Sequence, residues 1–144
     1  MKIQRNRISW EEYALLLARE ASKRSEDPFK KVGACALGYN NRVLGIAYNG
    51  LVSGKKVEKS FWNNRDYRLP YIIHAEQNLL SLFKRGEARM IACTLLPCSD
   101  CARLICSWEI PLVCYLDDYN RDNGAIEIFK FYNTKLKKLS LTGK

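Results

Sequence analysis

Histidine is nearly absent from this sequence, because His74 is the single example among 144 residues. Long apolar runs are absent as well, and no stretch approaches the roughly 20 residues that a helix needs to span a bilayer. The first residues carry positive charge with no apolar core behind them, so we do not expect a secretion signal. Repeats, low-complexity tracts and linkers are also missing. We therefore expect one domain over residues 1–144, no membrane partner and a cytoplasmic location (host cytoplasm for a viral protein).

Cysteine and positive charge are well represented, with six cysteines and a formal net charge of +9. In the cytoplasm, cysteines are more often metal ligands or buried thiols than disulfide partners. The charge favours an anionic ligand, either a nucleotide or a polynucleotide, although a solvated basic surface would carry it equally well. Four of the cysteines lie in apolar runs and are predicted to be buried free thiols: Cys35, Cys93, Cys106 and Cys114.

Hydrophobic periodicity predicts alternating helices and strands. Ser9 is expected to cap a first helix, with Glu12 three residues later, and its apolar positions are Tyr13, Leu16, Leu17 and Ala21. Further elements are predicted as a hairpin of residues 31–38 and 42–49, helices over 75–85, 99–108 and 123–132, and strands over 89–96, 110–116 and 134–141. Strands that alternate with helices predict an α/β fold with a mainly parallel sheet in three layers.

Residues 49–70 interrupt this alternation and carry little regular signal. The segment contains glycine, proline and five basic residues: Lys55, Lys56, Lys59, Arg65 and Arg68. A loop of this length is uncommon in a compact domain unless it has a function. The pattern leaves open whether the segment binds a ligand or is a solvated basic loop.

Two short motifs bring metal-binding residue types together. Pro97 ends a predicted strand, so Cys98 falls at a helix entrance, and Cys101 lies one turn later on the same side. A helix N-terminus lowers the pKa of a thiol and favours the thiolate, which is the form that binds zinc. His74 also lies at a predicted helix start. His74, Cys98 and Cys101 would hold Zn²⁺ and leave one tetrahedral position for water.

Glu76 follows His74 by two residues, which on a helix turns the side chain by about 200°. It is therefore expected to flank the zinc-activated water as a proton shuttle and not to bind the metal. A structural zinc site would need a fourth protein ligand, and neither Cys93 nor Cys106 is well aimed. Together the residues match the zinc-deaminase signature H-x-E…P-C-x-x-C.

The sequence resembles the cytidine and deoxycytidylate deaminases, most closely the deoxycytidylate (dCMP) deaminases, from about residue 14 to residue 132. The segments that carry the likeness are "RSEDPFKKVGACAL", "RVLGIAYNG", "HAEQNLL", "LLPCSDCARLI" and "YLDDY". The resemblance implies a three-layer α/β/α sandwich with a mixed five-stranded sheet and one catalytic Zn²⁺. It also implies hydrolysis of dCMP to dUMP and ammonia, which supplies dUMP for thymidylate synthesis.

Family analogy assigns further residues to the substrate. The backbone amide of Ala75 would hold the pyrimidine O2, Asn49 would bind the sugar hydroxyl, and Arg24, Ser25 and Tyr119 would contact the 5′-phosphate. Asn49 is equally typical of a turn in "NG", and Arg24 could instead stabilise a helix C-terminus. These alternatives stay open at the level of sequence.

The resemblance also implies a homohexamer and a regulatory nucleotide, with dCTP activating and dTTP inhibiting, together with Mg²⁺. The usual proline soon after Asn-Gly is missing here, and the segment after it has no clear counterpart. Two rival functions share the zinc motif: a deaminase acting on tRNA or single-stranded DNA, and a zinc-stabilised binding module without chemistry. We do not expect a nucleic-acid partner, because only residues 55–68 could form a basic stripe with aromatics.

Overall fold

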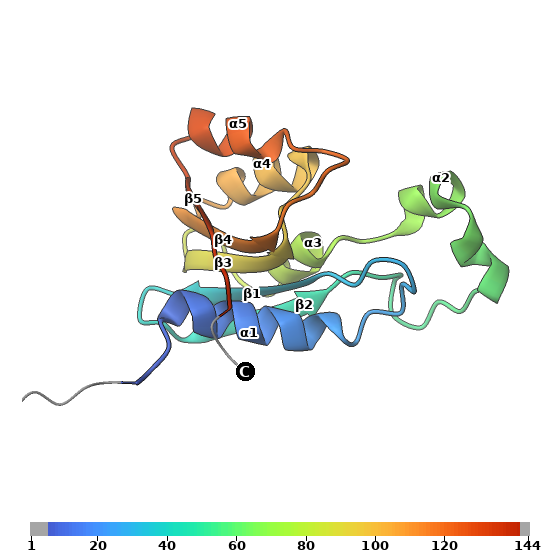
Figure 1. The fold of residues 1–144 in the computed structure, drawn as a ribbon, viewed down its shortest axis with the longest axis horizontal. Coiled ribbons are helices and arrows are strands. Elements are labelled where there is room, and N and C mark those ends of the chain that lie inside the picture. The colour runs from blue at the N-terminus through green and yellow to red at the C-terminus, as the bar shows by residue number, and fades with distance from the viewer. Residues whose placement is uncertain (1–5, 142–144) are drawn as a thin grey trace, which may run out of the picture.

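Five strands form one mixed sheet at the centre of the computed structural model, which describes residues 6–141 (Figure 1). The strands are β1 (Gly33–Gly38), β2 (Val43–Tyr48), β3 (Ala88–Leu95), β4 (Leu112–Asp117) and β5 (Lys135–Lys138), in the order β2-β1-β3-β4-β5. Strand β1 pairs antiparallel with β2 and β3, while β3, β4 and β5 run parallel. The predicted hairpin and the mixed five-stranded sheet are confirmed.

Helices cover both faces of the sheet. Helix α1 (Trp10–Ser22) lies on one face, and α3 (Ala75–Leu80), α4 (Ser99–Ser107) and α5 (Ala125–Phe131) lie on the other (Figure 1). Alternate residues of β1 and β3 enter the two cores, as expected for strands buried on both sides. Cys35 and Met90 pack toward α1, whereas Ala36 and Ile91 pack toward the opposite helices. The three-layer α/β/α prediction is confirmed.

The start of α1 agrees with the sequence, because Ser9 Oγ accepts a hydrogen bond from the Glu12 amide at 3.0 Å. Its buried face consists of Ala14, Leu15, Ala18 and Ala21, so Ala21 alone of the four predicted positions is fully buried. Alanine is favoured on this face because α1 lies very close to β1. A Cβ on Gly33 would come within 1.8 Å of the Ala18 carbonyl oxygen. Tyr13 stays 37% exposed.

Two other predicted elements need correction. Helix α3 ends at Leu80 and not at Arg85, because Leu82 bonds back to the Leu79 carbonyl at 3.0 Å and the following residues form turns. The segment after β2 is not structureless. It contains two 3₁₀ turns, Lys59–Asn63 and Leu69–Tyr71, and the short helix α2 (Arg65–Arg68), which lie at the edge of the domain (Figure 1).

Within residues 6–141, no helix is both long enough and apolar enough to cross a bilayer.

Candidate active site

His74 is positioned by hydrogen bonds on both sides of it. Gly50 and Ile73 exchange two backbone hydrogen bonds, at 3.0 and 2.8 Å, which place the end of β2 beside the start of α3. The side-chain amide of Asn78 donates to the Tyr48 carbonyl at 2.9 Å, so α3 is tied to the same strand end. As a result, the imidazole stands at the carboxyl edge of the sheet, where α/β folds place their sites.

Cys98 and Cys101 reach the same edge from β3 and α4. The chain leaves β3 through Leu96, whose amide donates to the Asp117 carbonyl at 2.8 Å, and Pro97 follows. Cys98 is the residue before α4 in an extended conformation, and Cys101 lies in the first turn of that helix. Both thiols therefore face the loop that carries His74.

The three side chains form a cluster with the dimensions of a zinc site. His74 Nδ1 lies 3.2 Å from Cys101 Sγ and 3.5 Å from Cys98 Sγ, and all three ligand atoms fall within 4.8 Å of one another. Tetrahedral zinc with Zn–N and Zn–S bonds of about 2.0–2.3 Å separates its ligand atoms by about 3.5–3.8 Å. The donor set and its spacing thus fit Zn²⁺. Within the described residues the cluster has three protein ligands, which leaves one tetrahedral position for a non-protein ligand.

The charge state of the thiols suits metal binding. Hydrogen bonds from the Cys101 thiol and from His74 lower the pKa of Cys98 to about 4. The same bond raises the pKa of Cys101, because its proton is held between the two sulfurs, and burial adds to the effect. The lowered pKa of Cys98 favours its thiolate, which is the form that binds zinc.

Glu76 lies beside this cluster and is almost fully enclosed. Its side chain is 4% exposed, and burial raises the pKa of its carboxyl to about 7. A carboxyl group with a pKa near neutrality can both accept and release a proton at physiological pH. The ligand cluster found among the described residues does not include Glu76, and its role as proton shuttle stays a prediction.

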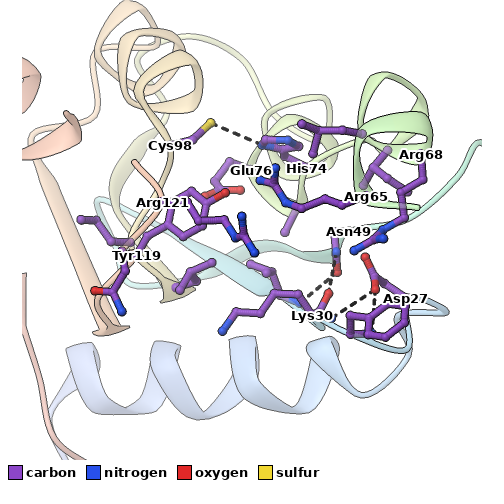
Figure 2. A pocket seen from close by; sticks show the side chains of 18 of the residues that line it. Asp27, Lys30, Asn49, Arg65, Arg68, His74, Glu76, Cys98, Tyr119 and Arg121 are labelled. Atoms are coloured by element: carbon purple, nitrogen blue, oxygen red, sulfur yellow. Dashed lines mark hydrogen bonds between the residues drawn. The ribbon is translucent and has the colours of Figure 1, made fainter. Parts of the chain in front are cut away.

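A pocket of about 390 Å³ opens over the cluster (Figure 2). Its floor contains His74, Glu76 and Cys98, and four basic side chains line it together with apolar and amide groups. Its lining comes from six parts of the chain: the turn after α1, the end of β2, the segment 65–72, the start of α3, the end of β3 and the loop after β4. The basic residues are Lys30, Arg65, Arg68 and Arg121.

Two acidic residues of the pocket have partners other than its four basic side chains. Asp118 pairs with Lys138 at 2.7 Å, and Asp27 is buried and accepts the backbone amides of Phe29 and Lys30 at 2.8 and 3.1 Å. Figure 2 shows Arg65 and Arg121 on opposite sides of the pocket, with the His74–Cys98 contact above them. Within residues 6–141 the four basic side chains form no ion pair, and such a group beside a polar cavity suits an anionic ligand.

The substrate-binding residues predicted from sequence fall into two groups. Asn49, Ala75 and Tyr119 line the pocket. The Asn49 amide is partly used, since it accepts from the Val32 amide and donates to the Lys30 carbonyl, both at 2.9 Å. One amide N–H and one lone pair stay available for a ligand. Ala75 is the first residue of α3, where a backbone N–H has no partner within the helix.

Arg24 and Ser25 are not among the pocket residues. The Ser25 hydroxyl is buried and donates to the Asn49 carbonyl at 2.9 Å, and the Arg24 guanidinium lies 5.9 Å from the centre of the Tyr48 ring. Their assignment to phosphate stays a prediction. Sequence reasoning missed Lys30 and Arg121, and it flagged Arg65 and Arg68 without a role. The basic composition of residues 55–68 indicated only Arg65 and Arg68.

Comparisons with known proteins agree with this geometry. Residues 8–117 match the family model described as the cytidine and deoxycytidylate deaminase zinc-binding region. Deoxycytidylate deaminase of Mus musculus is 31% identical over 146 residues, covering 92% of this chain and 81% of the relative, and that of Homo sapiens is 32% identical over 125 residues, covering 81% and 69%. The crystal structure of dCMP deaminase from cyanophage S-TIM5 superposes with a TM-score of 0.73 at 23% identity, covering 90% of this chain and 96% of that one.

This chain accordingly belongs to the cytidine and deoxycytidylate deaminase zinc-binding family.

Proposed function

We propose that this protein is a zinc-dependent deaminase that hydrolyses dCMP to dUMP and ammonia. The observation that carries the proposal is one pocket that combines the His74–Cys98–Cys101 cluster, the buried carboxyl of Glu76 and four basic side chains. The relatives named deoxycytidylate deaminase support the same activity.

The chemistry needs water to add at C4 of cytosine and the 4-amino group to leave as ammonia. Zinc, when bound, supplies activation of water at neutral pH. Glu76 takes a proton from that water, delivers it to N3 of the base, and passes a proton to the departing amine. The Ala75 amide holds the pyrimidine O2, and the free N–H or lone pair of Asn49 binds the sugar hydroxyl.

The phosphate is assigned to the basic side of the pocket. Lys30, Arg65 and Arg121 line it, and the nearby Asp27 and Asp118 have other partners. Guanidinium groups bind phosphate through two parallel hydrogen bonds, and Tyr119 adds a hydroxyl donor. By this assignment, Arg65 in the segment after β2 binds the substrate, so the segment is not only a regulatory site.

The decisive experiment compares turnover of dCMP, deoxycytidine and dCTP by the zinc-loaded protein. We expect dCMP to be converted with the highest kcat/KM, measured by loss of cytosine absorbance and by ammonia release. Equal turnover of deoxycytidine would refute the phosphate assignment. Faster conversion of single-stranded DNA or tRNA, with binding that weakens steeply as salt rises, would identify the protein as a polynucleotide deaminase.

Five further expectations stay predictions: one deaminase domain over residues 1–144, a cytoplasmic location, a homohexamer, control by dCTP and dTTP, and Mg²⁺ bound with the regulatory nucleotide. Sedimentation of the purified protein with and without dCTP and Mg²⁺ tests the assembly. Initial rates at low dCMP with added dCTP or dTTP test the control.

A further inference from the structure

Asp122 connects the loop after β4 to the start of α4. Its Oδ2 accepts the Ser99 amide at 2.8 Å, and its Oδ1 accepts the Ser99 hydroxyl at 2.7 Å and the Gly124 amide at 3.0 Å. These hydrogen bonds hold the pKa of Asp122 below its ordinary value, so the group is a carboxylate at neutral pH. Ser99 directly follows the predicted zinc ligand Cys98.

Helix α4 needs this external carboxylate because its own capping residue is used elsewhere. At the start of α1, Ser9 caps the helix with its side chain in the usual way. At the start of α4 the corresponding residue is Cys98, whose sulfur makes no capping hydrogen bond and faces His74 at 3.5 Å. Asp122 supplies the acceptor that Cys98 does not, and its charge is favourable at a helix N-terminus.

The fit between the two segments is close. A Cβ on Gly124 would lie 2.4 Å from the Ser99 hydroxyl oxygen, so a larger residue here would displace the hydroxyl that donates to Asp122. At the other end of the loop, the Asp117 carbonyl accepts the Leu96 amide at 2.8 Å. The loop is therefore held against the Pro97–Ser99 turn at both ends.

The same loop forms one side of the pocket. Asp118, Tyr119, Asn120 and Arg121 all line it, and Asp122 is the next residue. A change in the Asp122 hydrogen bonds would thus reach both the sulfur of Cys98 and the basic side chain of Arg121.

We propose that Asp122 is a positioning residue that holds the Cys98 sulfur and the Tyr119–Arg121 side of the pocket in one fixed register. Groups that hold metal ligands in place without touching the metal are worth about 10- to 100-fold in metal affinity or activity. The zinc part of this inference stands without the proposed reaction, whereas the part about Arg121 rests on it.

The direct test is Asp122→Asn, which keeps the size of the side chain but replaces one acceptor oxygen with a donor. We expect the zinc dissociation constant, measured by competition with a chromogenic chelator, to rise about 10-fold, the lower end of that range, because Asp122 bonds Ser99 and not Cys98 itself. We also expect the thiolate-to-metal band of the Co²⁺-loaded protein to change, and KM for dCMP to rise more than kcat falls. Asp100→Asn is the matched control, since it removes a charge from the same helix end, where Asp100 is 81% exposed and pairs with Arg103. The control should bind zinc within a few-fold of the parent.

A milder pair of variants keeps the test decisive if Asp122→Asn does not fold. Ser99→Ala removes one of the hydrogen bonds and should raise the zinc dissociation constant in the same direction by a smaller factor. Ser9→Ala removes the cap of α1 and should lower the melting temperature without changing zinc affinity, which separates positioning from general helix stability. Parental zinc affinity and cobalt spectrum in Ser99→Ala and Asp122→Asn would overturn the inference. If the parent binds zinc but turns over no dCMP, the proposed function fails while the zinc measurements still decide the role of Asp122.

Discussion

Arg68 lies over the ring of Phe29, with its guanidinium carbon 4.9 Å from the ring centre, and it donates to the Trp62 carbonyl at 2.9 Å. One side chain, which also lines the pocket, thereby joins the segment after β2 to the turn after α1. Trp62 is itself buried, with 8% exposure.

Substitution of Arg68 should loosen this segment. In Arg68→Ala we expect faster amide hydrogen exchange over residues 59–71 and a higher KM for dCMP, because both attachments are lost together. Arg68→Lys keeps the charge but loses the planar stacking and the fork of donors, so it should resemble the alanine variant. Parental exchange rates in both variants would show that Arg68 does not hold the segment.

Glu76→Gln should abolish most of the activity and leave the metal in place. The amide cannot shuttle protons, so we expect kcat to fall about 10²- to 10⁴-fold, with unchanged zinc content by elemental analysis. Glu127→Gln, an exposed carboxyl in the first turn of α5, is the control and should behave as the parent. Retained turnover in Glu76→Gln would show that Glu76 is not the proton shuttle.

Cys98→Ser should release the metal. A hydroxyl is a far weaker zinc ligand than a thiolate. We expect zinc affinity to fall by more than about 100-fold, because loss of a group that only hydrogen-bonds to a ligand already costs up to that much. Cys106 lies on the same helix, with its sulfur 3.6 Å from Thr134 Oγ1. The control variant Cys106→Ser should therefore keep zinc. Equal zinc content in the two variants, measured after dialysis against a chelator, would contradict the ligand set.

Neutralising Arg65 should weaken the activity on the nucleotide dCMP and leave the activity on the nucleoside deoxycytidine unchanged. A hydrogen bond to a charged group contributes about 1.5–3 kcal/mol, so Arg65→Gln is expected to raise KM for dCMP roughly 10- to 100-fold. Turnover of deoxycytidine, which lacks the phosphate, should not change. Arg42→Gln, an exposed arginine between β1 and β2, provides the control. A parallel loss for both substrates would mean that Arg65 acts on the structure of the pocket and not on phosphate.

Gly33→Ala should destabilise the fold by about 3 kcal/mol, because the new Cβ would meet the Ala18 carbonyl oxygen at 1.8 Å and force α1 away from the sheet. Gly38→Ala is on the same strand and would find its nearest neighbour, Asn40 Oδ1, at 3.4 Å. Urea unfolding monitored by tryptophan fluorescence gives the two free energies. Similar values for both variants would show that the helix can move without cost.

The elements that sequence analysis identified correctly are those with a local cause. The hairpin, β3, β4 and α4 follow from periodicity and turn residues, and the start of α1 follows from its Ser9 cap. One of the two errors has a non-local cause, because the inner face of α1 is set by its approach to Gly33. The other is local: α3 ends in turns after Leu80 that helical periodicity does not reveal.

The metal ligands were accessible from sequence because their spacing is a property of local geometry. Cys98 and Cys101 must share one side of a helix entrance whatever surrounds them, and Glu76 must point away from His74. The basic half of the pocket had no such signature. Lys30, Arg65 and Arg121 come from three separate segments, and only tertiary contacts bring them to one cavity. A short motif constrains atoms within a turn or two of the chain, whereas long-range packing of the loops decides which distant charges meet over the metal site.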